Sequence, residues 1–243
     1  STSRRQRQMC IRDSTDYAGK YAGMSTEESN PVILADMKAA GSLFASEDIV
    51  HSYPHCWRCK SPIIFRATPQ WFCSVERFRD DALKVCADVT WTPAWGGDRM
   101  VSMIKERADW CISRQRYWGL PIPVFYCADC GEIVCDEKTI ERVASLFAES
   151  GSNVWFEKEA SELLPAGYVC PKCGGVHFTK ETDTLDGWFD SGSTHFAVLD
   201  KRESLKWPAD LYLEGADQYR GWFQSSLLEA VAVRGGSPYK AVL

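Results

Sequence analysis

The sequence has no apolar run that approaches the roughly 18 residues of a membrane-spanning helix, and it has no signal peptide. It also has no excess of positive charge, because 28 Lys and Arg stand against 33 Asp and Glu and give a net charge of −5. An overall attraction to nucleic acid is therefore excluded, and any RNA contact has to come from a local patch. Internal repeats and low-complexity tracts are absent as well. We predict a cytoplasmic protein that makes no membrane contact.

The composition is otherwise ordinary for a globular protein, with 45% hydrophobic, 25% charged and 12% aromatic residues in 243. These values exclude a disordered chain, a collagen and a coiled coil. At roughly 150 residues per domain, the length predicts one or two domains. Residues 1–14 are rich in Arg and Gln and have no apolar period, so we expect a non-native leader without structure.

Apolar periodicity and turn residues predict the elements of the first two thirds of the chain. A short helix is expected from Pro31 to a stop at Gly41, which would take the C′ position. A strand is predicted over 63–65 and a Gly/Pro-rich loop over 88–99. The remaining apolar periods predict helices over 76–87, 100–107 and 137–149.

The last third predicts a βαβ unit. Residues 209–214 form a short apolar run that is typical of a strand buried on both faces, and a polar turn over 216–221 follows. Residues 222–233 have the period of a helix, and 239–243 begin a second strand. A strand, a helix and a strand within about 35 residues indicate a parallel sheet with a right-handed crossover. Since the sequence stops within this apolar strand, we expect the chain to be a fragment.

Two of three CxxC pairs predict a metal site. In a reducing compartment such pairs are more often zinc ligands than disulfides. Four thiolates suit a closed, structural Zn²⁺ site, and the glycines that follow each pair would let backbone amides approach the sulfurs. The two pairs are separated by 39 residues, which is longer than the usual zinc-ribbon loop. The expected ligands are Cys127, Cys130, Cys170 and Cys173.

Two alternatives stay open for these cysteines. The pairs could be reduced turns without a metal, or Cys135 could replace one ligand. The third pair, Cys56 and Cys59, stands alone and has no well-spaced histidine to complete a set of four ligands. We treat it as a possible half-site.

Three further segments could carry chemistry, and each has a plain structural alternative. Residues 214–222 follow a parallel strand, at the edge where open α/β sheets bind ligands, but a solvated, helix-capping loop would look the same. Residues 183–193 place Trp188 and Phe189 among carboxylates and glycines, as in an apolar pocket or a core. Residues 110–119 interleave Arg114 and Arg116 with aromatics, as in an RNA surface or an anchored turn.

Taken together, these segments resemble blocks of the isoleucyl-tRNA synthetases. The matching blocks are SYPHCWRCKSPIIFRATPQWF (52–72), WCISRQRYWGLPIP (110–123), DTLDGWFDSGSTHF (183–196) and DLYLEGADQYRGWFQSSLL (210–228). They occur in the family's order and cover about residues 36–243. Valyl and leucyl synthetases share the second and third types of block, whereas the pattern YLEGxDQxRGWFxSSLL is isoleucyl.

The resemblance implies an α/β fold: the second half of a class I Rossmann catalytic domain with a zinc-ribbon connective insertion and a remnant of the editing domain. The expected segments are the tail of the editing insertion (15–50), a connective and catalytic segment (51–124), a zinc-ribbon-like insertion (125–180) and the Rossmann second half (181–243). The implied activity is ATP- and Mg²⁺-dependent activation of isoleucine to the adenylate and its transfer to tRNA(Ile), with editing of valine. The full enzyme is expected to be a monomer.

The resemblance also implies roles for single residues. Glu214 would contact the aminoacyl-adenylate, Gly215 and Asp217 the adenosine ribose, and Gln218 the α-ammonium group of the substrate. Trp188 and Trp222 would wall the side-chain pocket. Arg114 and Arg116 are the candidates for tRNA contact.

The sequence departs from the family at two motifs. The His-Ile-Gly-His and Lys-Met-Ser-Lys-Ser motifs, which handle the ATP phosphates, do not occur in these 243 residues. We therefore expect this polypeptide alone to be inactive in adenylate formation. The alternatives are a stand-alone zinc module that binds RNA without catalysis, and a valyl-type synthetase.

Overall fold

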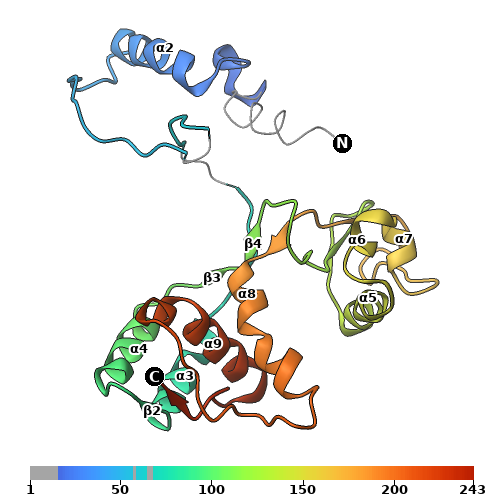
Figure 1. Ribbon diagram of the computed structural model, residues 1–243. Coiled ribbons are helices and arrows are strands. Elements are labelled where there is room, and N and C mark those ends of the chain that lie inside the picture. Colours follow the sequence, from blue (N-terminus) through green and yellow to red (C-terminus); the bar gives the residue numbers. More distant parts are fainter. Residues whose placement is uncertain (1–15, 57–58, 65–67) are drawn as a thin grey trace. The chain divides into compact units, whose positions relative to one another are not determined.

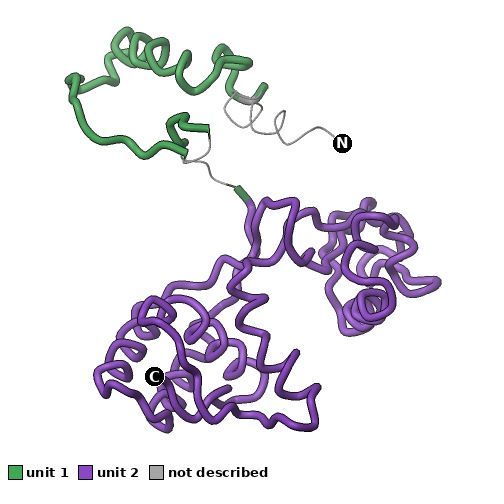
Figure 2. Tube along the Cα trace, in the orientation of Figure 1, with its two compact units in different colours: residues 1–68 green, residues 69–243 purple. Residues whose placement is uncertain are grey.

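The computed structural model describes residues 16–56, 59–64 and 68–243. The chain divides into two compact units, residues 1–68 and residues 69–243 (Figure 2). The leader predicted over 1–14 lies outside the described residues. None of the helices in the described ranges has the length and apolar character needed to cross a membrane.

The first unit contains the 3₁₀ helix η1 (Asp16–Tyr21) and the helix α2 (Thr26–Ala39). The predicted helix is present, but its predicted start is wrong. A capping box between Ser25 and Glu28 satisfies the first free backbone N–H groups, so the helix begins there and Pro31 lies inside it. Gly41 follows the C-cap residue with φ 68°, as predicted for C′. The predicted strand is wrong, since Ile63 and Ile64 have no strand structure and Phe65 lies outside the described residues.

The second unit contains a small set of parallel extended segments. Strand β2 (Thr90–Trp91) pairs in parallel with β9 (Ala241–Val242). Residues 209–214 run parallel to the opposite edge of β9, through the bridges Ala209↔Tyr239 and Tyr212↔Val242. The parallel pairing predicted for the last third is therefore confirmed. Burial on both faces is wrong, because Tyr212 is buried while Leu211 and Leu213 are 49% and 61% exposed.

Helices cover this parallel arrangement (Figure 1). They are η2 (Glu76–Phe78), α3 (Arg79–Ala87), α4 (Trp95–Lys105) and α9 (Trp222–Arg234), which confirms helices in the three regions predicted within this part of the chain. The core between them includes Met100, Ile104, Phe223, Leu227 and Tyr239. Helix α9 is buried over all of residues 223–231, not along one face only.

The loop predicted over 88–99 is confirmed only in part: residues 88–89 and 92–94 are turns, but 90–91 form β2 and 95–99 form the first turn of α4. Gly96 and Gly97 in this turn lie very close to aromatic side chains of other elements. A Cβ on Gly96 would lie 2.0 Å from the Tyr219 hydroxyl oxygen, and one on Gly97 would lie 2.8 Å from Cδ1 of Trp91. Glycine therefore marks tight tertiary packing here, which a sequence pattern cannot distinguish from a loop.

A helical segment that packs on α9 connects to this core through short antiparallel pairs. Strand β1 (Phe72–Cys73) pairs with β3 (Trp110–Cys111), and β4 (Ser113–Arg114) pairs with β8 (Thr184–Leu185). The helix α8 (Gly187–Gly192) follows β8 and leads into the π-helix η3 (His195–Leu199). Helix α8 therefore carries the 183–193 motif against α9.

Residues 125–180, which lie between the 110–119 and 183–193 motifs, have a core of their own. Strands β5 (Phe125–Cys127), β6 (Ile133–Val134) and β7 (Phe178–Lys180) form an antiparallel sheet in the order β6-β5-β7. Its helices are α5 (Glu137–Ser150), as predicted, α6 (Val154–Glu157) and α7 (Ala160–Leu163). Phe125 and Trp155 lie at the centre of this second core.

Candidate functional site

The 214–222 motif forms a turn at the carboxyl end of a parallel segment. Residues 209–214 run beside β9, and the 3₁₀ helix η4 (Ala216–Arg220) then leads into α9. The backbone N–H of Gly215 donates to Oε1 of Glu214 at 2.9 Å, and the N–H of Gln218 donates to the carbonyl of Gly215 at 3.0 Å. The turn therefore occupies the edge where open α/β sheets bind ligands, as the sequence predicted.

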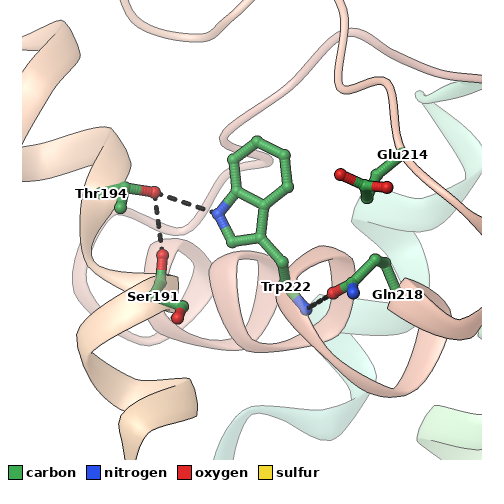
Figure 3. Close-up of a pocket in the computed structure, with 5 residues that line it drawn as sticks. All are labelled: Ser191, Thr194, Glu214, Gln218 and Trp222. Carbon is green, nitrogen blue, oxygen red and sulfur yellow. Dashed lines mark hydrogen bonds between the residues drawn. The ribbon is translucent and has the colours of Figure 1, made fainter.

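A cavity of about 330 Å³ opens between this turn and α8 (Figure 3). Glu214, Gln218 and Trp222 line it from one motif, and Ser191 and Thr194 line it from the other. The two motifs are therefore brought together in space. Its only charged lining side chain is the carboxylate of Glu214, beside the amide of Gln218.

Contacts on several sides hold the indole of Trp222. Its ring stacks on Tyr212 with centroids 3.9 Å apart and planes 12° apart. Its backbone N–H donates to Oε1 of Gln218 at 2.9 Å, and its indole Nε1–H donates to Oγ1 of Thr194 at 3.0 Å. The Thr194 hydroxyl in turn donates to the carbonyl oxygen of Ser191 at 2.8 Å.

Trp188 lies next to the turn but does not line the cavity. Its ring packs against Gly221, where a Cβ would come within 2.7 Å of Cη2 of Trp188 and 2.5 Å of Oε1 of Gln218. The side chain of Trp188 is 44% exposed. Asp217 is exposed and receives a bond from Nε2 of Gln218 at 3.4 Å, and it does not line the cavity either.

Asp186 anchors the start of α8 and was not singled out from the sequence. Its side chain is nearly buried; Oδ2 accepts from Nε1 of Trp110 at 3.0 Å and pairs with Nη2 of Arg114 at 2.9 Å. Its Oδ1 caps the helix through the N–H of Trp188 at 3.4 Å. Arg114 also donates to the carbonyls of Cys111 and Ser113, so it is engaged within the chain, whereas Arg116 is exposed.

Three titratable groups on α8, η3 and α9 have shifted pKa values, and two of them, Glu229 and His195, are buried. Burial raises the pKa of Glu229 to about 8, and the neighbouring Asp190 adds to this shift. Burial, followed by the charge of Asp186, raises the pKa of Asp190. Burial lowers the pKa of His195 to about 4, aided by the nearby charge of Arg234. Sequence reasoning missed these groups, because a Glu in a helix gives no sign of its burial.

The sequence also assigned no role to Ser191 and Thr194. For Ser191 a signal existed, because it stands three residues after Trp188 and therefore near it on a helical surface. Thr194 follows α8 and gave no such signal.

The four cysteines predicted as metal ligands form a cluster. Their sulfur atoms all lie within 4.8 Å of one another, and the closest pairs are 3.6 Å (Cys127 to Cys173) and 3.7 Å (Cys130 to Cys170). A tetrahedron with Zn–S bonds of about 2.3 Å has sulfur separations of roughly 3.8 Å, so the geometry suits a metal ion. Gly131 and Gly174 follow the pairs with φ 73° and 74°, values that favour glycine.

Among the described residues, no other cysteine joins this group. Cys135 lies outside the cluster, so it replaces none of the four ligands. Over residues 16–56, 59–64 and 68–243, Cys56 and Cys59 belong to no set of three or more metal-ligating side chains. The two residues between them lie outside the described part.

Sequence comparison with known proteins agrees with the family resemblance of the sequence blocks. The family model described as tRNA synthetases class I (I, L, M and V) matches residues 3–243. The curated "Isoleucine--tRNA ligase" of Carboxydothermus hydrogenoformans is 58% identical over 232 residues, which cover 94% of this chain and 25% of that protein. The "Isoleucine--tRNA ligase" of Caldicellulosiruptor bescii is also 58% identical, over 229 residues with the same coverage. The chain thus spans about a quarter of the length of these relatives.

Solved structures match as well. One of them is the ternary complex of LeuRS, tRNA and LeuAMS from Agrobacterium radiobacter K84, with a TM-score of 0.37 and 24% identity. The match covers 55% of this chain and 18% of the other.

Proposed function

The chain belongs to the class I tRNA synthetases (I, L, M and V), and we propose that it is part of an isoleucine--tRNA ligase. The complete enzyme would activate isoleucine with ATP and Mg²⁺, transfer it to tRNA(Ile) and edit mischarged valine. It would act as a monomer. The observation that carries the proposal is that residues of two motifs line one shared cavity: Glu214, Gln218 and Trp222 on one side, and Ser191 and Thr194 on the other.

In this proposal the cavity receives the amino acid. The amide oxygen of Gln218 accepts one bond from the N–H of Trp222, and a carbonyl oxygen has a second lone pair that can accept from the substrate ammonium group. Glu214 supplies a negative charge beside it and would contact the aminoacyl-adenylate. Both groups suit a cation.

The apolar part of the substrate would lie against tryptophan. Trp222 borders the cavity, and Trp188 packs on Gly221 immediately before it. A branched aliphatic side chain gains from burial against such rings. We assign the adenosine ribose to Gly215 and Asp217, which lie on the exposed side of the turn.

The fold supports a division into functional segments. We propose a Rossmann second half over 181–243, a connective and catalytic segment over 51–124, and a tail of the editing insertion over 15–50. The insertion over 125–180 would be a zinc ribbon, in which the four clustered thiolates bind Zn²⁺ and stabilise the segment's own core. Arg116 is the better candidate for tRNA contact, since Arg114 is paired with Asp186.

The test is isoleucine-dependent exchange of pyrophosphate into ATP by the complete enzyme. We expect exchange with isoleucine, and we expect Trp222→Ala to raise the KM for isoleucine about tenfold to a hundredfold, because it removes an apolar wall. Trp118→Ala is the control, since Trp118 is almost fully exposed and lies outside the cavity. A Trp222→Ala enzyme with the KM of the wild type would remove Trp222 from the pocket. A wild type without isoleucine-dependent exchange would overturn the proposed function.

A further inference from the structure

Stacking on Tyr212 does not by itself decide which edge of the Trp222 indole faces the cavity. Stacking fixes the plane of the ring, and the observed planes differ by only 12°. It does not fix which edge points to which side, because the torsion that carries an aromatic ring is broad and roughly two-fold. A rotation by about half a turn would leave the rings parallel but present a different edge of the indole to the cavity.

Thr194 distinguishes these orientations. Its Oγ1 accepts the indole Nε1–H of Trp222 at 3.0 Å, and its own hydroxyl donates to the carbonyl oxygen of Ser191 at 2.8 Å. The Tyr212 hydroxyl also interacts with the Thr194 side chain, and this contact remains when Trp222 is replaced by Phe. Because that proton is donated to the backbone, a lone pair of Oγ1 is directed at the indole. Figure 3 shows this chain of bonds from the helix backbone through Thr194 to the ring.

We propose that Thr194 is a positioning residue for amino-acid binding: its hydroxyl holds the indole of Trp222 in the one orientation that presents the correct ring edge to the substrate side chain. This inference rests on the proposed function of the cavity. It adds Thr194, which follows α8 and acts on the substrate through its hydrogen bond with Trp222.

The chain offers a matched set of variants. Thr194→Val keeps the shape of the side chain and removes the hydroxyl, whereas Thr194→Ser keeps the hydroxyl. Ser193→Ala is the control, because the Ser193 hydroxyl makes the same kind of bond to the carbonyl three residues earlier, at 2.9 Å to Asp190, and does not line the cavity.

The experiment measures pyrophosphate exchange by the complete enzyme. We expect Thr194→Val to raise the KM for isoleucine about tenfold with kcat within about twofold of the wild type, because an indole N–H loses its acceptor and the ring its fixed orientation. Thr194→Ser and Ser193→Ala should remain within about twofold of the wild-type KM. The thermal unfolding midpoint of each variant, including Thr194→Val, shows whether the substitution destabilises the fold in general.

A double-mutant cycle separates positioning from a direct effect. Trp222→Phe keeps a ring that can stack on Tyr212 but removes the indole N–H. If Thr194 acts through that group, Thr194→Val should change KM by less than about twofold in the Trp222→Phe background. An unaltered KM in Thr194→Val, an equal loss in Thr194→Ser, or a full tenfold effect in the Phe background would each overturn the proposal. A wild type without isoleucine-dependent exchange would instead overturn the proposed function, and this inference with it.

Discussion

The contact between α8 and α9 depends on the absence of a side chain at Gly192. Gly192 is buried, and a Cβ there would lie 2.1 Å from Oε1 of Glu229, 2.7 Å from its Cδ and 3.0 Å from the backbone carbon of Ser225. A carboxylate end can move aside, but the backbone of a buried helix cannot. Gly192→Ala therefore has to push the two helices apart.

The size of the effect follows from two opposing contributions. Overpacking a tight contact costs about 1–3 kcal/mol, and replacing Gly by Ala in a helix returns up to about 1 kcal/mol. Because backbone is involved, we expect a net loss of about 2 kcal/mol, which lowers the unfolding midpoint by roughly 4–8 °C in a domain of 150–250 residues.

The assay is thermal unfolding followed by near-ultraviolet circular dichroism, which reports on the packed tryptophans. Gly187→Ala is the matched control, because it lies in the same helix and a Cβ there meets no atom within 4 Å. We expect that control to match or exceed the wild type. A Gly192→Ala protein with the wild-type midpoint would refute the reasoning that backbone proximity makes this glycine necessary.

Two further predictions concern the metal cluster and the buried carboxyl group. Cys170→Ser should abolish binding of about one zinc per chain, measured by metal analysis, whereas Cys135→Ser outside the cluster should retain it; equal zinc content in both would contradict the assignment. Because the pKa of Glu229 is raised from 4.5 to about 8, the unfolded chain loses this proton first and stability falls as pH rises from 4.5 to 8, by about 5 kcal/mol. In denaturant titrations at pH 5 and pH 8, Glu229→Gln should abolish most of this fall in the free energy of unfolding. If the variant loses as much stability between the two pH values as the wild type, Glu229 does not cause the fall.

The parts of the fold that the sequence predicted are those set by local chemistry. Cysteine spacing predicted the cluster, because two CxxC turns each place their sulfurs on one side. The helix predicted over 222–233 is present as α9, and Gly235 caps it with φ 68°. An apolar run before an acidic turn predicted a candidate site at the end of residues 209–214, and a cavity lies there.

The parts that failed depend on contacts between distant residues. Gly96 and Gly97 suggested a loop, yet they stand in a helix because Tyr219 and Trp91 pack closely on them. Residues 209–214 suggested a strand buried on both faces, but side chains alternate along an extended chain. Only Tyr212 is buried in the core, and Ala209 packs against it partly buried. No local pattern reports such partners.

The three sequence motifs are coupled through α8, although only two of them line the cavity. Asp186 holds the start of this helix to Trp110 and Arg114 of the third motif. After its last turn, Thr194 accepts a hydrogen bond from Trp222 of the 214–222 motif. Since α8 is only six residues long, we expect a shift at its start to reach the cavity wall. The third motif can therefore influence the cavity without lining it. Arg114 thus has a structural role, the ion pair with Asp186, that does not require contact with RNA.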